Sequence, residues 1–161
     1  GSTGAIFYFS MYGAPELDGH VSKFACEQKR LVMAKQKGLQ CYPNRKNVDI
    51  SYVPPTEWLT LIKDAEYVIT DSFHATVFSI IFKKKFVSII SNSKYAQRRK
   101  VRIVDLLTSL GLQERLIYSS DAHRLADVIT KDINYEAVST KVNFKVKESK
   151  NYLQKALVGE L

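Results

Sequence analysis

The sequence predicts an α/β fold: a Rossmann-like, three-layer domain with a mostly parallel sheet of about five strands, helices on both faces and a C-terminal helical tail. Short apolar segments rich in β-branched and aromatic residues alternate with longer segments of helical periodicity. No Asn-Gly or Asp-Gly turn joins one predicted strand directly to the next, so helices are expected to connect the strands. The composition, 45% hydrophobic and 25% charged, is typical of a globular domain.

The predicted strands are short, and each is bounded by turn or helix signals. In chain order they cover residues 5–9, 39–42, 66–70, 86–90 and 115–118, and residues 48–53 are expected to be extended.

The predicted helices rest on apolar residues at helical spacing and on residues that start or stop helices. They cover Ser22 to Lys37, a segment that begins at Pro54-Pro55, Ala75 to Phe82, a segment that ends at Gly111, Asp121 to Lys131, and the tail from Tyr135 to Leu157 with a break near Asn143. The segment 75–82 is hydrophobic nearly all round, so it is expected to be buried.

The 161 residues are enough for a single domain, and no linker or internal repeat divides them. Residues 1–4 have the character of a cloning remnant, and we expect the natural chain to extend upstream. The two cysteines, Cys26 and Cys41, lack the spacing of a disulfide framework or a metal site, which favours a reducing cytosol with Cys26 as a buried thiol. No apolar run approaches the roughly 20 residues of a membrane span.

The charge is positive: 24 lysines and arginines against 16 acidic residues give a formal net charge of +8. Such an excess favours an anionic partner, although it also serves solubility alone. A basic cluster follows the fourth predicted strand and consists of Lys94, Arg98, Arg99, Lys100 and Arg102. Because aromatic residues are not interleaved with it and no nucleic-acid-binding motif is present, nucleic acid is not the expected partner.

The segment from Thr70 to Thr76 is the predicted functional site. A buried strand ends there and a helix begins, and ligands of parallel α/β sheets bind beyond the carboxyl ends of the strands. Asp71 or Ser72 can cap the helix, whose first free N–H groups would attract an anion. His74 lies at this junction, where it can donate or accept a proton near neutral pH or simply serve as a capping or core residue.

The segment from Asp64 to Val87, DAEYVITDSFHATVFSIIFKKKFV, resembles the central signature of polysaccharide pyruvyl transferases. The resemblance covers most of residues 50–160. Ala75 stands where the family often has Gly, and Lys85 where it often has Pro.

This resemblance implies a GT-B-like enzyme of two domains, of which residues 1–161 form the C-terminal half and the N-terminal domain is missing. It implies phosphoenolpyruvate as the donor, a pyruvate ketal on a polysaccharide sugar as the product, and His74 as the catalytic residue. The acceptor would be a glycan or a lipid-linked oligosaccharide, which places the enzyme in the cytoplasm with peripheral association at the inner face of the membrane. The family also uses an arginine from earlier in the chain, which we do not expect within these residues.

The residues fit such a donor. The phosphate of phosphoenolpyruvate suits the helix start at Ser72, Ala75 and Thr76, and its carboxylate suits the forked side chain of an arginine. The candidate arginines are Arg98, Arg99 and Arg102. No metal and no cofactor other than the donor substrate is expected, because neither metal-ligand spacing nor a glycine-rich dinucleotide motif is present. The alternative is a non-catalytic Rossmann-like module that binds a nucleotide or nucleotide-sugar.

Overall fold

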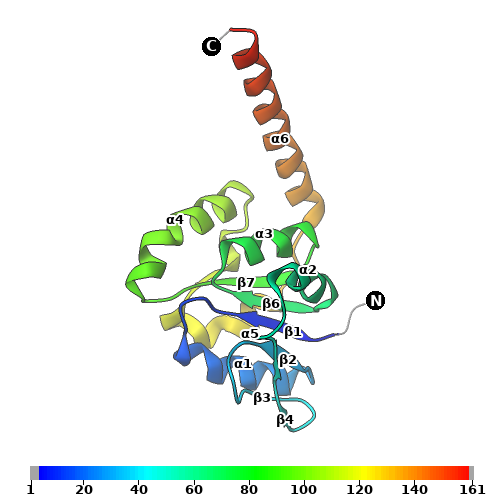
Figure 1. Cartoon of the computed structure of the whole chain (residues 1–161), viewed down its shortest axis with the longest axis vertical. Coiled ribbons are helices and arrows are strands. Elements are labelled where there is room, and N and C mark those ends of the chain that lie inside the picture. The colour runs from blue at the N-terminus through cyan, green and yellow to red at the C-terminus, as the bar shows by residue number, and fades with distance from the viewer. Residues whose placement is uncertain (1–3, 160–161) are drawn as a thin grey trace.

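The computed structural model describes residues 4–159, and its centre is a six-stranded parallel sheet (Figure 1). The strands lie in the order β5-β2-β1-β6-β7-β8, and every neighbouring pair is parallel. Their bounds are β1 Ile6–Phe9, β2 Val32–Ala34, β5 Val48–Asp49, β6 Tyr67–Thr70, β7 Lys85–Ile90 and β8 Leu116–Tyr118. The chain first builds one half of the sheet outward from β1 and then the other, so the order reverses between β1 and β6, where such sheets bind ligands.

Helices cover both faces of the sheet, which gives the three layers that the sequence predicts (Figure 1). The helices are α1 Pro15–Glu27, α2 Pro55–Asp64, α3 Phe73–Ile81, α4 Lys94–Ser109, α5 Leu125–Ile129 and α6 Tyr135–Leu157, with 3-10 segments η1 Gln113–Arg115 and η2 Ser119–Arg124. Helices α1 and α5 share one face with η2, and α2, α3 and α4 share the other. A small antiparallel pair, β3 Gln40–Cys41 and β4 Arg45–Lys46, lies beside the sheet.

Both faces of the central strands are buried, as expected of a parallel sheet covered by helices. In β1, Ile6 and Tyr8 pack toward α1 and α5, whereas Phe7 and Phe9 pack toward α2 and α3. All four side chains are buried. The apolar run of residues 5–9 is therefore the middle of the core, and it fixes the position of the strand end that leads into the candidate site.

The largest departure from the sequence prediction lies in residues 15–37. The expected helix from Ser22 to Lys37 is wrong: α1 begins at Pro15 and ends at Glu27, and residues 32–34 form the buried strand β2. Proline suits the first turn of a helix because it lacks the N–H that would be unsatisfied there. The short run Val32–Ala34 is extended because it pairs with β1 on one side and β5 on the other. The expected strand 39–42 consequently lies outside the main sheet, in β3.

The basic cluster is helical, because α4 begins at Lys94 and is capped by Ser93, whose hydroxyl accepts the N–H of Ala96 at 3.1 Å. Two smaller expectations are corrected. Helix α6 runs without a break through Asn143. Cys26 is exposed instead of buried, whereas Cys41 is buried, and neither is in a disulfide. Residues 1–3 of the expected cloning remnant lie outside the described residues.

Helix α6 projects away from the rest of the domain (Figure 1). Val138 near its start is buried against the α2–α4 face, but Phe144, Leu153 and Leu157 are exposed. Among residues 4–159, no helix combines the length and apolar character that crossing a membrane would require.

Candidate functional site

The turn between β6 and α3 is held by hydrogen bonds from its own hydroxyl groups. Thr70 donates its hydroxyl to the carbonyl of Phe9 at 2.8 Å, and its oxygen accepts the N–H of Ser72 at 3.0 Å. The Ser72 oxygen in turn accepts the N–H of Ala75 at 3.3 Å, which caps α3. These bonds fix the start of α3 at the carboxyl edge of the sheet, where the sequence predicts the site.

Thr76 fastens α3 to the sheet. Its hydroxyl donates to the carbonyl of Ser72 at 2.9 Å and lies 2.7 Å from the hydroxyl of Ser88 on β7. Thr76 and Ser88 are both fully buried. The Thr76 hydroxyl and the Ala75 N–H, both predicted to bind a phosphate, are thus engaged within the turn. Phe73 and His74 remain as first-turn residues whose N–H groups have no acceptor among the described residues.

Asp71 joins this turn to the loop that follows β1. Its carboxylate accepts the hydroxyl of Ser10 at 2.7 Å and the backbone N–H groups of Met11 and Tyr12 at 2.7 and 3.2 Å. The side chain is only 6% exposed. A buried carboxylate requires such partners, and three donors satisfy much of its acceptor capacity. We call these contacts the Asp71 clasp. From the sequence, Asp71 was expected only as an alternative helix cap.

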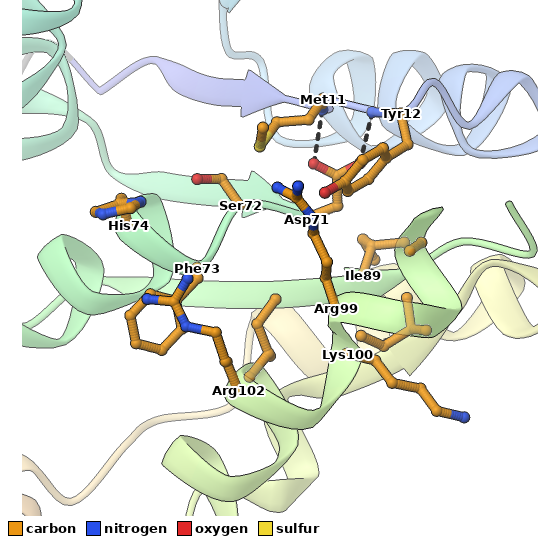
Figure 2. A pocket seen from close by; sticks show the side chains of 13 residues that line it. Met11, Tyr12, Asp71, Ser72, Phe73, His74, Ile89, Arg99, Lys100 and Arg102 are labelled. Carbon is orange, nitrogen blue, oxygen red and sulfur yellow. Dashed lines mark hydrogen bonds between the residues drawn. The ribbon is translucent and has the colours of Figure 1, made fainter. Parts of the chain in front are cut away.

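A cavity of about 120 Å³ opens between this turn, β7 and α4 (Figure 2). His74 and the first turn of α3 line one side, Met11 and Tyr12 another, and Arg99, Lys100 and Arg102 of α4 a third. Of the predicted site residues, the cavity brings together Ser72, His74, Arg99 and Arg102. Arg98 is exposed on the same helix but does not line the cavity.

Two arginines give the cavity its chemical character. The guanidinium of Arg102 lies 4.0 Å from the centre of the Phe73 ring, a stacking contact that holds the charge beside the start of α3. Arg99 points toward Asp71 and Tyr12 (Figure 2). Neither arginine forms an ion pair or a hydrogen bond with another described residue. Because the charge of Asp71 is already engaged, these arginines and the α3 N-terminus make the cavity suited to an anion.

His74 is exposed at the edge of this cavity. Its ring stands edge-on to that of Phe73, with 5.8 Å between the ring centres and an interplanar angle of 83°. The imidazole makes no hydrogen bond with other described residues, so both nitrogens are available to a ligand. The structure therefore does not make His74 a core residue, and its side chain does not cap α3, since Ser72 does.

A metal site does not form among residues 4–159: no three side chains of histidine, cysteine, aspartate or glutamate gather closely enough to hold an ion. Apart from the Asp71 carboxylate, which is engaged in its clasp, the polar groups that line the cavity include cations, N–H donors and one imidazole. Such a set can bind a small molecule carrying carboxylate or phosphate and can exchange a proton with it.

Comparison with known families agrees with this geometry. Residues 14–94 match the family model described as polysaccharide pyruvyl transferase, whereas a search of curated proteins finds no significant match. The matched region runs from the start of α1 to the start of α4 and contains Asp71 and His74. The donors of the clasp, Ser10, Met11 and Tyr12, lie just before it, and Arg99 and Arg102 lie just beyond it. Since the match covers half of the chain, the protein belongs to the polysaccharide pyruvyl transferase family.

Proposed function

We propose that this chain carries the donor site of an enzyme that transfers the pyruvyl group of phosphoenolpyruvate to two hydroxyls of a bacterial polysaccharide sugar. The product is a pyruvate ketal. Family membership supports pyruvyl transfer in general, and one observation supports the donor: His74, the start of α3 and two unpaired arginines line the same cavity. Phosphoenolpyruvate carries two anionic groups, and the cavity offers two arginines, Arg99 and Arg102, to receive them.

In this proposal, Arg99 and Arg102 bind the carboxylate of the donor. The phosphate is bound by the same two arginines together with the N–H groups of Phe73 and His74. Ser72, Ala75 and Thr76 act indirectly, since their hydrogen bonds hold the first turn of α3 in place. Arg98 is left out of the donor contacts because it stands outside the cavity wall. The acceptor site would be completed by the expected upstream domain.

The reaction balances as follows. The two sugar oxygens each form a bond to C2 of the donor, the C2–C3 double bond takes up a proton to become a methyl group, and the bond from C2 to the phosphate oxygen breaks. Of the two protons that the hydroxyls lose, one is accounted for in the methyl group and the other leaves with phosphate. His74 is the group that relays a proton, as a base toward a sugar hydroxyl or as an acid toward C3. General acid–base catalysis of this kind contributes about 10²–10⁴-fold.

The donor site is tested by titrating the chain with phosphoenolpyruvate while the imidazole signals of its three histidines are followed by NMR. One signal should shift saturably, and it should be the signal that disappears in His74→Ala. His123→Ala is the matched control, because His123 is also exposed but lies on η2, away from the cavity. A nucleotide that shifts the His74 signal where phosphoenolpyruvate does not would favour the nucleotide-binding alternative instead.

Turnover is tested in the enzyme that includes the upstream domain. His74→Ala should lower kcat by at least about a hundredfold. The melting temperature should stay unchanged, since the exposed imidazole makes no hydrogen bond with other described residues. Near-native turnover in His74→Ala would contradict the assignment, and His123→Ala should remain fully active.

A further inference from the structure

A second cavity, of about 450 Å³, lies between α2 and α3 beyond the end of β1. Its wall is mostly apolar and includes Phe9, Trp58 and Phe78. The proposed donor cavity, by contrast, is lined by three cationic side chains. The two cavities are therefore suited to ligands of different chemistry.

Three residues, Met11, Ser72 and His74, line both cavities. His74 thus stands on the wall between a cationic space and an apolar one. A group transfer between two substrates needs the reacting atoms within a few ångströms of each other and of the proton-transferring group. The position of His74 meets that requirement if one substrate occupies each cavity.

The aromatic part of the second cavity is rigidly held. The indole N–H of Trp58 donates to the carbonyl of Val53 at 3.1 Å, and the indole packs against Phe9 with 4.4 Å between ring centres. Trp58 is nevertheless only half-buried, so the remainder of its ring is available to the cavity. Because the indole is already held in place, it loses little conformational entropy when a ligand packs on its flat apolar surface.

We propose that this second cavity binds the acceptor, with the C–H face of a pyranose ring against Trp58 and Phe78 and the hydroxyl pair turned toward His74. The inference rests on the proposed function, which requires a sugar beside the donor. A pyranose ring has apolar C–H faces and a polar edge. The cavity matches this division, since its polar side chains, Ser72 and His74, both lie on the shared wall. Burying hydroxyls against the aromatic side would leave them without partners, which disfavours the opposite orientation.

Trp58 is the only tryptophan of the chain, so its fluorescence reports on this cavity alone. The 161-residue chain is titrated with a panel of methyl pyranosides, with and without phosphoenolpyruvate. At least one pyranoside should change the Trp58 emission saturably, and Phe78→Ala should weaken that response while the phosphoenolpyruvate-induced shift of the His74 NMR signal remains. If no pyranoside changes the emission while the His74 signal still responds to phosphoenolpyruvate, the acceptor site is overturned and the donor site stands.

Kinetics in the enzyme with its upstream domain give the second measurement. Trp58→Leu should raise the KM for the acceptor about tenfold and leave the KM for phosphoenolpyruvate unchanged. The matched control is Tyr52→Leu, since Tyr52 is 88% exposed and lies outside the cavity. An unchanged acceptor KM in Trp58→Leu would overturn the proposal and would indicate that the upstream domain covers this cavity. If the unsubstituted enzyme does not bind phosphoenolpyruvate, the proposed function itself is contradicted.

Discussion

Arg115 and Arg102 carry the same type of side chain but lie at opposite ends of the sheet. Arg115 precedes β8, is 3% exposed and donates to four backbone carbonyls, those of Phe86, Val128, Ile129 and Lys131. Arg102 lies at the carboxyl edge, is exposed, and stacks on the ring of Phe73. One guanidinium uses four of its five N–H donors within the fold, whereas the other makes no hydrogen bond with another described residue.

This difference in hydrogen bonding distinguishes an arginine that stabilises the fold from one that is available to bind a ligand, which position in the sequence alone does not. Arg115 has no acidic partner within hydrogen-bonding distance among the described residues, and burial lowers its pKa. Each of its three nitrogens nevertheless donates a hydrogen bond, and together they tie the carbonyls at the end of α5 to β7. Arg102 and Arg99 make no such hydrogen bonds to other described residues. Their N–H donors are therefore available to bind an external anion.

The strongest test of this comparison is Arg115→Met, which keeps the length of the side chain and removes every donor. We expect the free energy of unfolding to fall by about 3–5 kcal/mol, because several buried carbonyls lose their partner at once. Urea denaturation measures it. Arg115→Lys should be nearly as damaging, since one ammonium cannot reach carbonyls that a planar fork reaches. A loss below about 1 kcal/mol would show that water replaces the guanidinium easily.

The next test is Arg102→Ala, which should have the opposite profile. The Kd for phosphoenolpyruvate should rise about ten- to a hundredfold, as expected when a charged hydrogen-bond partner is lost. The melting temperature should hardly change. Arg98→Ala is the matched control, because Arg98 is exposed on the same helix but stands outside the cavity. Equal losses of affinity in both variants would mean that only the general positive charge of α4 matters.

The smallest expected effect belongs to Asp71→Asn, a charged group that is anchored and yet lines the cavity. An amide keeps one acceptor oxygen, so the clasp loses part of its hydrogen bonding and about 1–2 kcal/mol of stability. Hydrogen exchange at the N–H groups of Met11 and Tyr12 should become faster, since these are the donors released. Ser10→Ala removes only one hydroxyl from the clasp and should leave both amides protected. Unchanged exchange in Asp71→Asn would show that the loop after β1 is held by other contacts.

Much of the fold could be predicted from local signals. The sequence 67–81 combines a four-residue run of β-branched and aromatic residues, a capping serine and a largely apolar helix, and β6 and α3 form there as expected. Residues 32–34 could not be assigned in this way. A strand of three residues is too short to show a recognisable hydrophobic periodicity. Val32–Ala34 is extended because it pairs with β1 and β5 in the sheet.

The candidate site was predictable only in part, for a similar reason. The location of His74 followed from the rule that ligands bind at the carboxyl edge of the sheet. The Asp71 clasp joins residues about 60 positions apart, and the choice between Arg98 and Arg99 depends on which side of α4 faces the cavity. The second cavity has no local signature either, because α2 and α3 contribute its wall from two separate segments.

The Asp71 clasp also has a consequence for the inheritance of this site. Because the buried acid at position 71 accepts the hydroxyl at position 10, a change at one position alters the partner that the other position contacts. We therefore expect the two positions to covary among related sequences. Arg98, which forms no hydrogen bond or ion pair with another described residue, should vary independently of them. In an alignment of related sequences, correlated substitutions at positions 10 and 71 would identify this loop even where the residues that contact the substrate have diverged.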